Sequence, residues 1–246
     1  MSLSGEPLPA AAGGLRGAIF DFGGVMTESL FRRRRDADPE LVGLLAFFYQ
    51  DLRAVYHLPT STHDLHQLEI GKLSEAEFYR RICERYEAEG NPRVDPERVR
   101  ALVFPNHAEA SAAMVDAVRQ VREAGYRTAL LTNNAREWEP MWRPLVPVDE
   151  LFHVVVDSSV VGLRKPDPQV YELTCERLGL QPNECIFVDD LECNVDAAAA
   201  LGMEVVHCVD PTAAADTVAR RLLGRPASAE SENGAARLAA EEDGRR

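Results

Sequence analysis

The chain of 246 residues is poor in basic residues and contains almost no lysine. Its 27 lysines and arginines face 40 acidic residues, which gives a net charge of -13 at pH 7. Nucleic-acid-binding proteins usually present a basic surface, so we expect no nucleic acid partner. The one dense basic run, residues 32–35, is interpreted as a solvated turn. Because only Lys72 and Lys165 are lysines, each raises a separate question about its function.

Long apolar runs and paired cysteines are also missing. No apolar stretch approaches the roughly 20 residues that cross a bilayer. The first residues lack the basic and apolar segments of a signal peptide. The five cysteines show neither a CxxC motif nor the spacing of a disulfide framework. We therefore expect reduced thiols, no membrane contact and a cytoplasmic protein, either monomer or homodimer.

Short apolar runs alternate with helical patterns along much of the chain. The runs that have the length and character of buried strands cover residues 17–21, 127–131, 152–156, 185–188 and 204–208. The segments with helical periodicity between them cover residues 113–124, 168–178, 194–201 and 212–223. This alternation predicts an α/β fold, a doubly wound Rossmann-like parallel sheet with helices on both faces.

A helical segment interrupts the pattern after the first strand. Residues 29–105 show helical periodicity and no strand pattern, so we interpret them as an inserted all-α cap domain. Within it, Ser74 and Glu77 have the spacing of a capping box at a helix start. The α/β core would then comprise residues 16–28 and 106–224, with disordered tails expected at residues 1–15 and 225–246.

Polar residues stand where the predicted strands end or helices begin: Asp21, Thr132, Asn133, Lys165, Asp189 and Asp190. Because the carboxyl ends of parallel strands share one edge of the sheet, these residues can converge. Asp21 and Asp190 are suited to hold Mg²⁺, and Asp21 to attack phosphorus as a nucleophile. Thr132, Asn133 and Lys165 would bind the phosphate oxygens. The pattern predicts phosphoryl transfer.

Four segments, in this order, resemble the motifs of the haloacid dehalogenase superfamily with a helical cap inserted after the first motif. They are residues 20–25 (FDFGGV), 130–134 (LLTNN), 162–168 (GLRKPDP) and 187–190 (FVDD), with Asn194 following. The resemblance extends over roughly residues 16–223 and implies Mg²⁺ as the cofactor.

The resemblance also implies a role for each matching residue. Asp21 would be the catalytic nucleophile and a metal ligand, and Gly23 would offer the metal its backbone carbonyl. Asp190 would bind the metal directly, and Asp189 directly or through water. Lys165, the second catalytic residue, would bind phosphate together with Thr132 and Asn133.

One position departs from the superfamily pattern. Phosphatases of this superfamily usually carry a second aspartate two residues after the nucleophile, where it protonates the leaving oxygen. Gly23 occupies that position here. Glu28, the cap or solvent would have to supply the proton. The DFGGV form resembles sugar-phosphate phosphatases and the phosphatase-like half of epoxide hydrolases.

The leading interpretation is a Mg²⁺-dependent phosphatase that hydrolyses a small organic phosphate, such as a sugar phosphate, through an aspartyl-phosphate on Asp21. One alternative is a 2-haloacid dehalogenase, although these typically have an aromatic residue at the position of Gly23 and lack the acidic pair. Another is a non-catalytic protein that binds a phosphate ligand. His63 and His66 are interpreted as surface residues rather than metal ligands, and Lys72 as part of a solvated turn.

Overall fold

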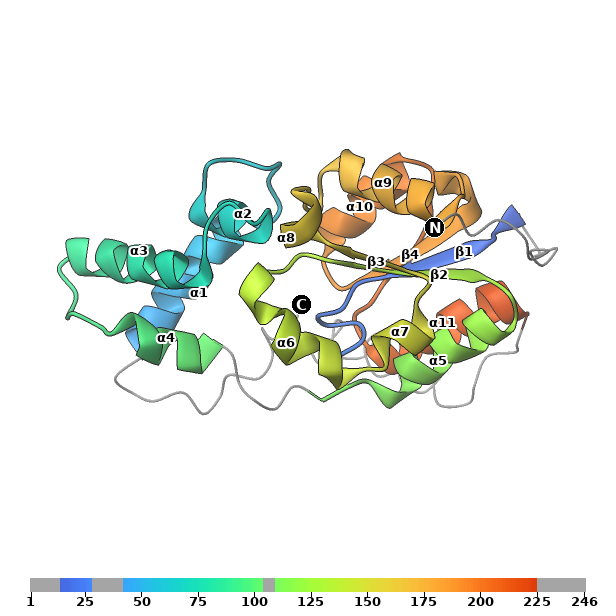
Figure 1. Ribbon diagram of the computed structural model, residues 1–246, viewed down its shortest axis with the longest axis horizontal. Helices are drawn as coiled ribbons and strands as arrows, with labels where there is room; N and C mark the ends of the chain where they lie inside the picture. The colour runs from blue at the N-terminus through green and yellow to red at the C-terminus, as the bar shows by residue number, and fades with distance from the viewer. Residues whose placement is uncertain (1–13, 28–41, 104–108, 225–246) are drawn as a thin grey trace, which may run out of the picture.

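The computed structural model of the protein describes residues 14–27, 42–103 and 109–224. Its centre is a parallel sheet of five strands in the order β3-β2-β1-β4-β5 (Figure 1). The strands are β1 (Gly17–Phe20), β2 (Arg127–Thr132), β3 (Val154–Asp157), β4 (Cys185–Asp189) and β5 (Glu204–His207). The chain winds outward from β1 in both directions, which confirms the predicted doubly wound α/β sheet.

Helices cover both faces of this sheet (Figure 1). The four long ones are α5 (Ala112–Glu123), α9 (Pro168–Leu178), α10 (Glu192–Ala200) and α11 (Pro211–Leu223). Successive side chains of a strand point to opposite faces, so Phe20 packs in the cluster beside α5 and α11. Its neighbour Ile19 packs in the cluster beside α9. Both faces are therefore buried, which explains why the strands read as continuous apolar runs.

Short helices that the sequence did not predict occupy residues 136–161. They are η3 (Arg136–Trp138), α6 (Glu139–Trp142), η4 (Arg143–Leu145), α7 (Val148–Leu151) and α8 (Ser158–Val161). None is long enough to display a helical period. They also shift the third strand, because Phe152 donates its N–H to Val148 and so closes α7. The strand predicted at residues 152–156 therefore begins at Val154 instead.

Four helices lie beyond one end of the sheet (Figure 1). They are α1 (Val42–Val55), α2 (Asp64–Glu69), α3 (Glu75–Ala88) and α4 (Pro96–Val103), and residues 42–103 are called the helical insert below. The insert contains no strand in this described range and has its own apolar cluster. Ser74 accepts a hydrogen bond from the Glu77 N–H at 3.3 Å, so it caps α3 as predicted.

Several expectations fall outside the described residues. These concern Glu28, the arginines at 32–35, residues 1–13 of the predicted N-terminal tail and the whole predicted C-terminal tail. Leu15, expected in the N-terminal tail, is instead buried in the core beside α5 and α11. The predicted tail therefore ends at least one residue earlier.

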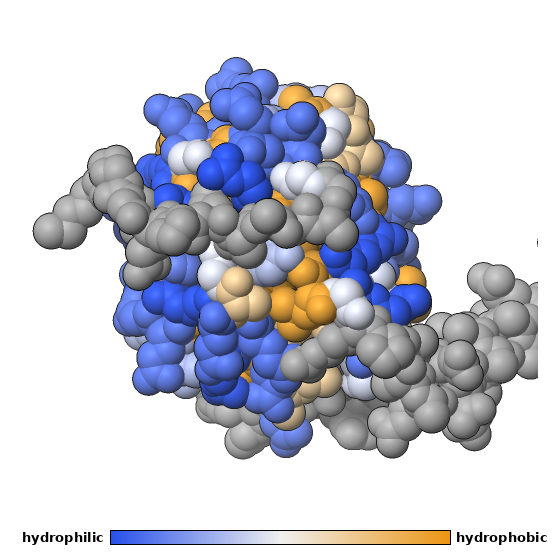
Figure 2. All heavy atoms as spheres, turned by 90° about the vertical axis from the view of Figure 1, so that its right-hand side faces the viewer, coloured by the Kyte–Doolittle hydropathy of each residue, from blue (hydrophilic) through white to orange (hydrophobic). Residues whose placement is uncertain are grey.

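The side of the core remote from the helical insert is mostly hydrophilic, with a small apolar patch at its centre (Figure 2). Among the residues that the structure describes, no helix combines the length and apolarity needed to cross a bilayer.

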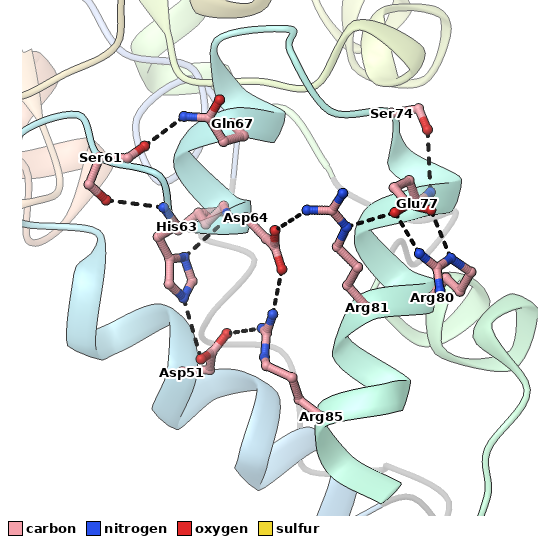
Figure 3. Close-up of polar contacts among 11 residues, drawn as sticks. Asp51, Ser61, His63, Asp64, Gln67, Ser74, Glu77, Arg80, Arg81 and Arg85 are labelled. Atoms are coloured by element: carbon pink, nitrogen blue, oxygen red, sulfur yellow. Dashed lines mark hydrogen bonds and ion pairs between the residues drawn. The ribbon is translucent and has the colours of Figure 1, made fainter. Parts of the chain in front are cut away.

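Ion pairs join three helices of the insert (Figure 3). Asp64 of α2 accepts from Arg81 at 2.9 Å and from Arg85 at 2.5 Å, both on α3. Arg85 also reaches Asp51 of α1 at 2.7 Å. The side chains are partly exposed, so each pair adds little to stability by itself. Together they fix how α1, α2 and α3 are oriented.

The histidines of the insert correct one expectation. His66 is fully buried rather than at the surface. Its Nδ1 accepts the Ser61 N–H at 3.1 Å, and its Nε2 lies 2.9 Å from the Val55 carbonyl, to which the neutral ring donates. Burial, strengthened by repulsion from Arg164, lowers the pKa of His66 to about 4. Both ring nitrogens thus serve the fold, and a metal role is excluded for this residue.

The buried His66 predicts a pH-dependent loss of stability. In the unfolded chain the His66 ring takes up a proton near its ordinary pKa of 6.5. In the folded chain it does so only near pH 4. Stability from this residue is present above pH 6.5 and is lost as the pH falls toward 4, by up to roughly 3 kcal/mol. Urea unfolding between pH 7.5 and 4.5 measures it. His66→Gln should flatten the decline, whereas the exposed His57→Gln should keep the wild-type slope. Equal slopes in all three proteins would contradict the assignment.

Candidate active site

Carboxylates from two neighbouring strands meet at one edge of the sheet. Asp21 follows β1 directly, and its N–H donates to Val188 of β4 at 2.9 Å. Asp189 ends β4 and Asp190 follows it. One oxygen from each of these three side chains lies within 4.8 Å of the other two. The convergence predicted from the strand ends is therefore present in the structure.

A buried lysine lies between two of these carboxylates. Lys165 Nζ is 2.7 Å from Asp21 Oδ1 and 2.6 Å from Asp189 Oδ2, and its side chain is only 1% exposed. Burial alone would lower the pKa of Lys165, but attraction by Asp189 and Asp21 outweighs it and raises that pKa above its usual value. Lys165 is therefore a permanent cation at the centre of the site. The other lysine, Lys72, is exposed in a turn, as predicted.

Backbone and amide contacts fix Lys165 and Asp189 in place. The Asn133 amide donates to the Lys165 carbonyl at 2.9 Å and accepts the Lys165 N–H at 2.8 Å. Asp189 Oδ1 accepts from Leu191 N–H and from Asn194 Nδ2, each at 2.9 Å. The Asn133 side chain, predicted to hold phosphate, thus orients Lys165. Asn194 likewise holds Asp189, the first residue of the acidic pair.

The negative charge of the cluster is not fully balanced within the chain. Burial raises the pKa of Asp21 to about 8, with Asp189 and Asp190 adding repulsion against the lowering effect of Lys165. A carboxylate with such a pKa is neutral at pH 7 unless a further cation stabilises its charged form. The three carboxyl groups therefore form a site that a further cation would stabilise.

Two adjacent glycines beside the cluster have different constraints. Gly24 has a φ of +79°, and a Cβ added there would lie 2.1 Å from Asp190 Oδ2. A Cβ added to Gly23 would meet nothing within 4 Å. Gly24 is therefore required by the backbone and by Asp190, whereas Gly23 leaves open space beside Asp21.

A cavity of about 170 Å³ lies between these groups and the helical insert. Its polar side includes Asp21, Thr132 and Lys165. Its opposite wall is largely apolar and comes mostly from the insert: Phe48, Tyr49, Leu52, Tyr56, Leu65, Phe78, and Trp138 of the core. A larger, open hollow of about 830 Å³ shares Asp190 but contains neither Asp21 nor Lys165. The chemistry therefore belongs to the smaller cavity.

Three contacts seat the insert on the core. Trp138 Nε1 donates to Glu75 Oε1 at 2.8 Å. Gly71, with φ of +71°, brings the backbone so close to Ser159 that a Cβ would lie 2.3 Å from its carbonyl oxygen. Arg164, which precedes Lys165, extends from the core into the insert. These contacts hold the insert against the core beside the cavity.

Arg164 and Glu69 line the cavity, and no role was predicted for either from the sequence. Arg164 is 1% exposed and donates to three acceptors of the insert: Glu69 Oε2 at 2.5 Å, Leu58 O at 3.0 Å and Tyr56 O at 2.9 Å. Arg164 lies inside the motif at residues 162–168, which could have drawn attention to it. Glu69 belongs to none of the four motifs, and only the packing of the insert against the core shows that it lines the cavity.

Comparisons with known proteins agree with this geometry. The family model described as haloacid dehalogenase-like hydrolase matches residues 15–202. Acyl-CoA dehydrogenase family member 10 of Mus musculus is 40% identical over 46% of this chain, which spans 10% of that protein. Glyceraldehyde 3-phosphate phosphatase of Methanopyrus kandleri is 29% identical over 55% of this chain and 67% of its own length. Other matches are named phosphatases and haloacid dehalogenases.

Solved structures share the fold. A crystal structure of a HAD family enzyme from Bacteroides thetaiotaomicron, in complex with magnesium and inorganic phosphate, superposes with a TM-score of 0.53. It is 23% identical and covers 78% of this chain and 93% of its own. At that identity the likeness supports the architecture alone.

The two glycines predict opposite responses to the same substitution. Gly24→Ala should lower the free energy of unfolding by about 1–3 kcal/mol, because alanine is strained at this φ and displaces Asp190. Gly23→Ala should change it by no more than about 0.5 kcal/mol, because its Cβ enters open space. Urea unfolding of both variants makes the comparison. Similar losses in the two proteins would show that the described geometry around Asp190 is wrong.

Proposed function

Because the chain belongs to the haloacid dehalogenase-like hydrolases, we propose that it is a Mg²⁺-dependent phosphatase acting on a small organic phosphate monoester. The observation that carries this proposal is the Lys165 ammonium group between Asp21 and Asp189 at the floor of the cavity. A carboxylate nucleophile and a phosphate dianion repel each other. Catalysis therefore needs fixed positive charge at that point.

The donor set fits Mg²⁺. Carboxylate oxygens are the hard ligands that this ion prefers, and the raised pKa of Asp21 to about 8 marks negative charge that the chain does not balance. Asp21, Asp190 and the Gly23 carbonyl would hold it. Asp189, already bonded to Lys165, Leu191 N–H and Asn194, would contribute through water. When bound, the ion offsets the charge of phosphate and carboxylates.

Each residue of the site then has its own role in the reaction. Asp21 attacks phosphorus, the bond from phosphorus to the leaving oxygen breaks, and the leaving oxygen takes a proton from solvent to depart as the alcohol. Water attacks the aspartyl-phosphate at phosphorus, which releases phosphate and restores Asp21. Lys165 and Thr132 bind phosphate oxygens, and Asn133 holds Lys165 in position. The insert acts as a cap that excludes bulk water.

Metal-free attack on a haloacid is less compatible with this site. A 2-haloacid is an anion, and three clustered carboxylates with one lysine would repel it unless a metal ion were added. The same cluster with a bound divalent ion attracts phosphate. The carboxylate cluster therefore favours the phosphatase over the dehalogenase.

Removing the nucleophile tests the proposed function. Wild type should release phosphate from some members of a panel of small phosphate esters with Mg²⁺ and not with EDTA. Asp21→Asn should lower kcat by on the order of 10³-fold or more, because the amide cannot form the aspartyl-phosphate. Its free energy of unfolding should not fall, since asparagine matches aspartate in size and removes the repulsion from Asp189 and Asp190. Turnover that survives in Asp21→Asn would contradict the proposal. Phosphate binding without turnover in wild type would favour the non-catalytic binder.

The open space at Gly23 permits a second test. Gly23→Asp would place an acid beside Asp21 and should raise the rate on alkyl phosphates by roughly 10²-fold or more. Anomeric phosphates, whose leaving groups need little protonation, should gain much less. Gly23→Asn matches the size without the acid and serves as the control. Equal rates for Gly23→Asp and Gly23→Asn on alkyl phosphates would show that the reaction does not lack an acid at this position.

A further inference from the structure

One acidic residue on the cavity wall has no part in the reaction described above. Glu69 is the last residue of α2 and lines the same cavity as Asp21 and Lys165. It is the only acidic residue that the described part of the insert contributes to this lining. The insert's other contributions are apolar or aromatic. Glu69 is therefore the one charged acceptor that the described part of the insert presents on this wall.

Its side chain is held in one orientation. Glu69 Oε2 accepts from Arg164 Nε at 2.5 Å, and Arg164 is itself fixed by the carbonyls of Leu58 and Tyr56. No other hydrogen bond to Glu69 is found within residues 14–27, 42–103 and 109–224. The Glu69 side chain is 14% exposed although it lies between the insert and the core. Because Glu69 lines the cavity and keeps this exposure, a molecule inside the cavity can reach its side chain.

The surrounding charges decide which group suits this acceptor. Arg164 neutralises Glu69 in the pair, and Lys165 adds a second cation nearby. A cationic ligand group would be repelled by both, whereas an apolar group would leave the buried oxygen without a partner. A hydroxyl group satisfies the acceptor without adding charge. Aromatic side chains on the same wall can pack against its carbon atoms.

We propose that Glu69 is a specificity-determining residue that accepts a hydrogen bond from a hydroxyl group on the leaving group of the substrate. This rests on the proposed function for the identity of the substrate as a phosphate monoester. Arg164 acts as a positioning residue, since it orients Glu69 before the substrate arrives. The substrate class is thus a phosphate monoester of a diol or polyol rather than of a simple alcohol.

Binding of non-hydrolysable phosphonates tests the inference without requiring turnover. The probes are ω-hydroxyalkyl phosphonates of two to five carbons, each paired with the alkyl phosphonate in which a methyl group replaces the hydroxyl. Calorimetry with Mg²⁺ present gives Kd for both members of each pair. At the best chain length, wild type should bind the hydroxyl member at least about tenfold more tightly, as for a hydrogen bond to a charged group.

Two variants distinguish an effect of Glu69 itself from a general effect on the insert. Glu69→Gln keeps an oxygen for Arg164 but turns an amide donor toward the cavity, so the preference should fall to about twofold or less. The alkyl member should bind as in wild type. Asp64→Asn is the matched control, because Asp64 is also on α2 and also ion-paired with arginine (Figure 3). Its side chain is similarly exposed, at 12%, yet it does not line the cavity. It should keep the wild-type preference.

The possible results separate this inference from the proposed function. A hydroxyl preference lost in Glu69→Gln and kept in Asp64→Asn supports it, even if the matching phosphate esters are never hydrolysed. Equal affinity for both members at every chain length overturns it, even if those esters are hydrolysed with Mg²⁺. Loss of the preference in both variants overturns it as well, because the effect would then come from the insert as a whole. Failure of every phosphonate to bind also overturns it.

Discussion

The Lys165 ammonium group is the contact on which the site depends. Three carboxylates are gathered within a few ångströms at a buried strand edge, and like charges in that setting repel strongly. Lys165 bonds to two of them at once, and the Asn133 amide clamps its backbone from both sides. Burial would favour the neutral form of an isolated lysine, but Lys165 stays charged because two carboxylates bind it. A buried cation of this kind keeps the nucleophile and the acidic loop together.

Arg164, the residue before Lys165, connects this site to the helical insert. Arg164 points away from the carboxylates and gives all three of its hydrogen bonds to the insert, while Lys165 gives its own to the floor of the site. Two adjacent residues of one loop thus couple the insert to the nucleophile. Specificity and chemistry are set by separate elements, but a single short segment fixes their relative position.

The two neighbouring glycines differ in how much space the site leaves for a side chain. Gly24 is required because its backbone conformation and the approach of Asp190 leave no room for a side chain. Gly23 is not required by space, so the lack of an acid there is a chemical property of the chain and not a packing constraint. A leaving group recognised by its own hydroxyl and held under a closed insert is consistent with a site that relies on positioning.

Sequence patterns were enough to predict the α/β architecture, the five strands and the placement of four polar residues at one sheet edge: Asp21, Lys165, Asp189 and Asp190. These follow from local rules, namely apolar runs, helix starts and the shared edge of parallel strands. The patterns also predicted the capped start of α3 at Ser74. The short helices of residues 136–161 escaped prediction because they are too short to show a period. His66 was wrongly placed at the surface because one helical turn does not reveal what packs over it.

Only the tertiary structure decided what the insert contributes. The pairing of Glu69 with Arg164 joins residues 95 positions apart, and no local pattern encodes the packing that brings them together. The same holds for the contacts of the Asn133 amide with Lys165, which no motif encodes. The phosphate role expected of Asn133 stays a prediction. Strand ends converge by topology, so sequence can locate them. Walls of a cavity form by packing between domains, which depends on every side chain at the contact.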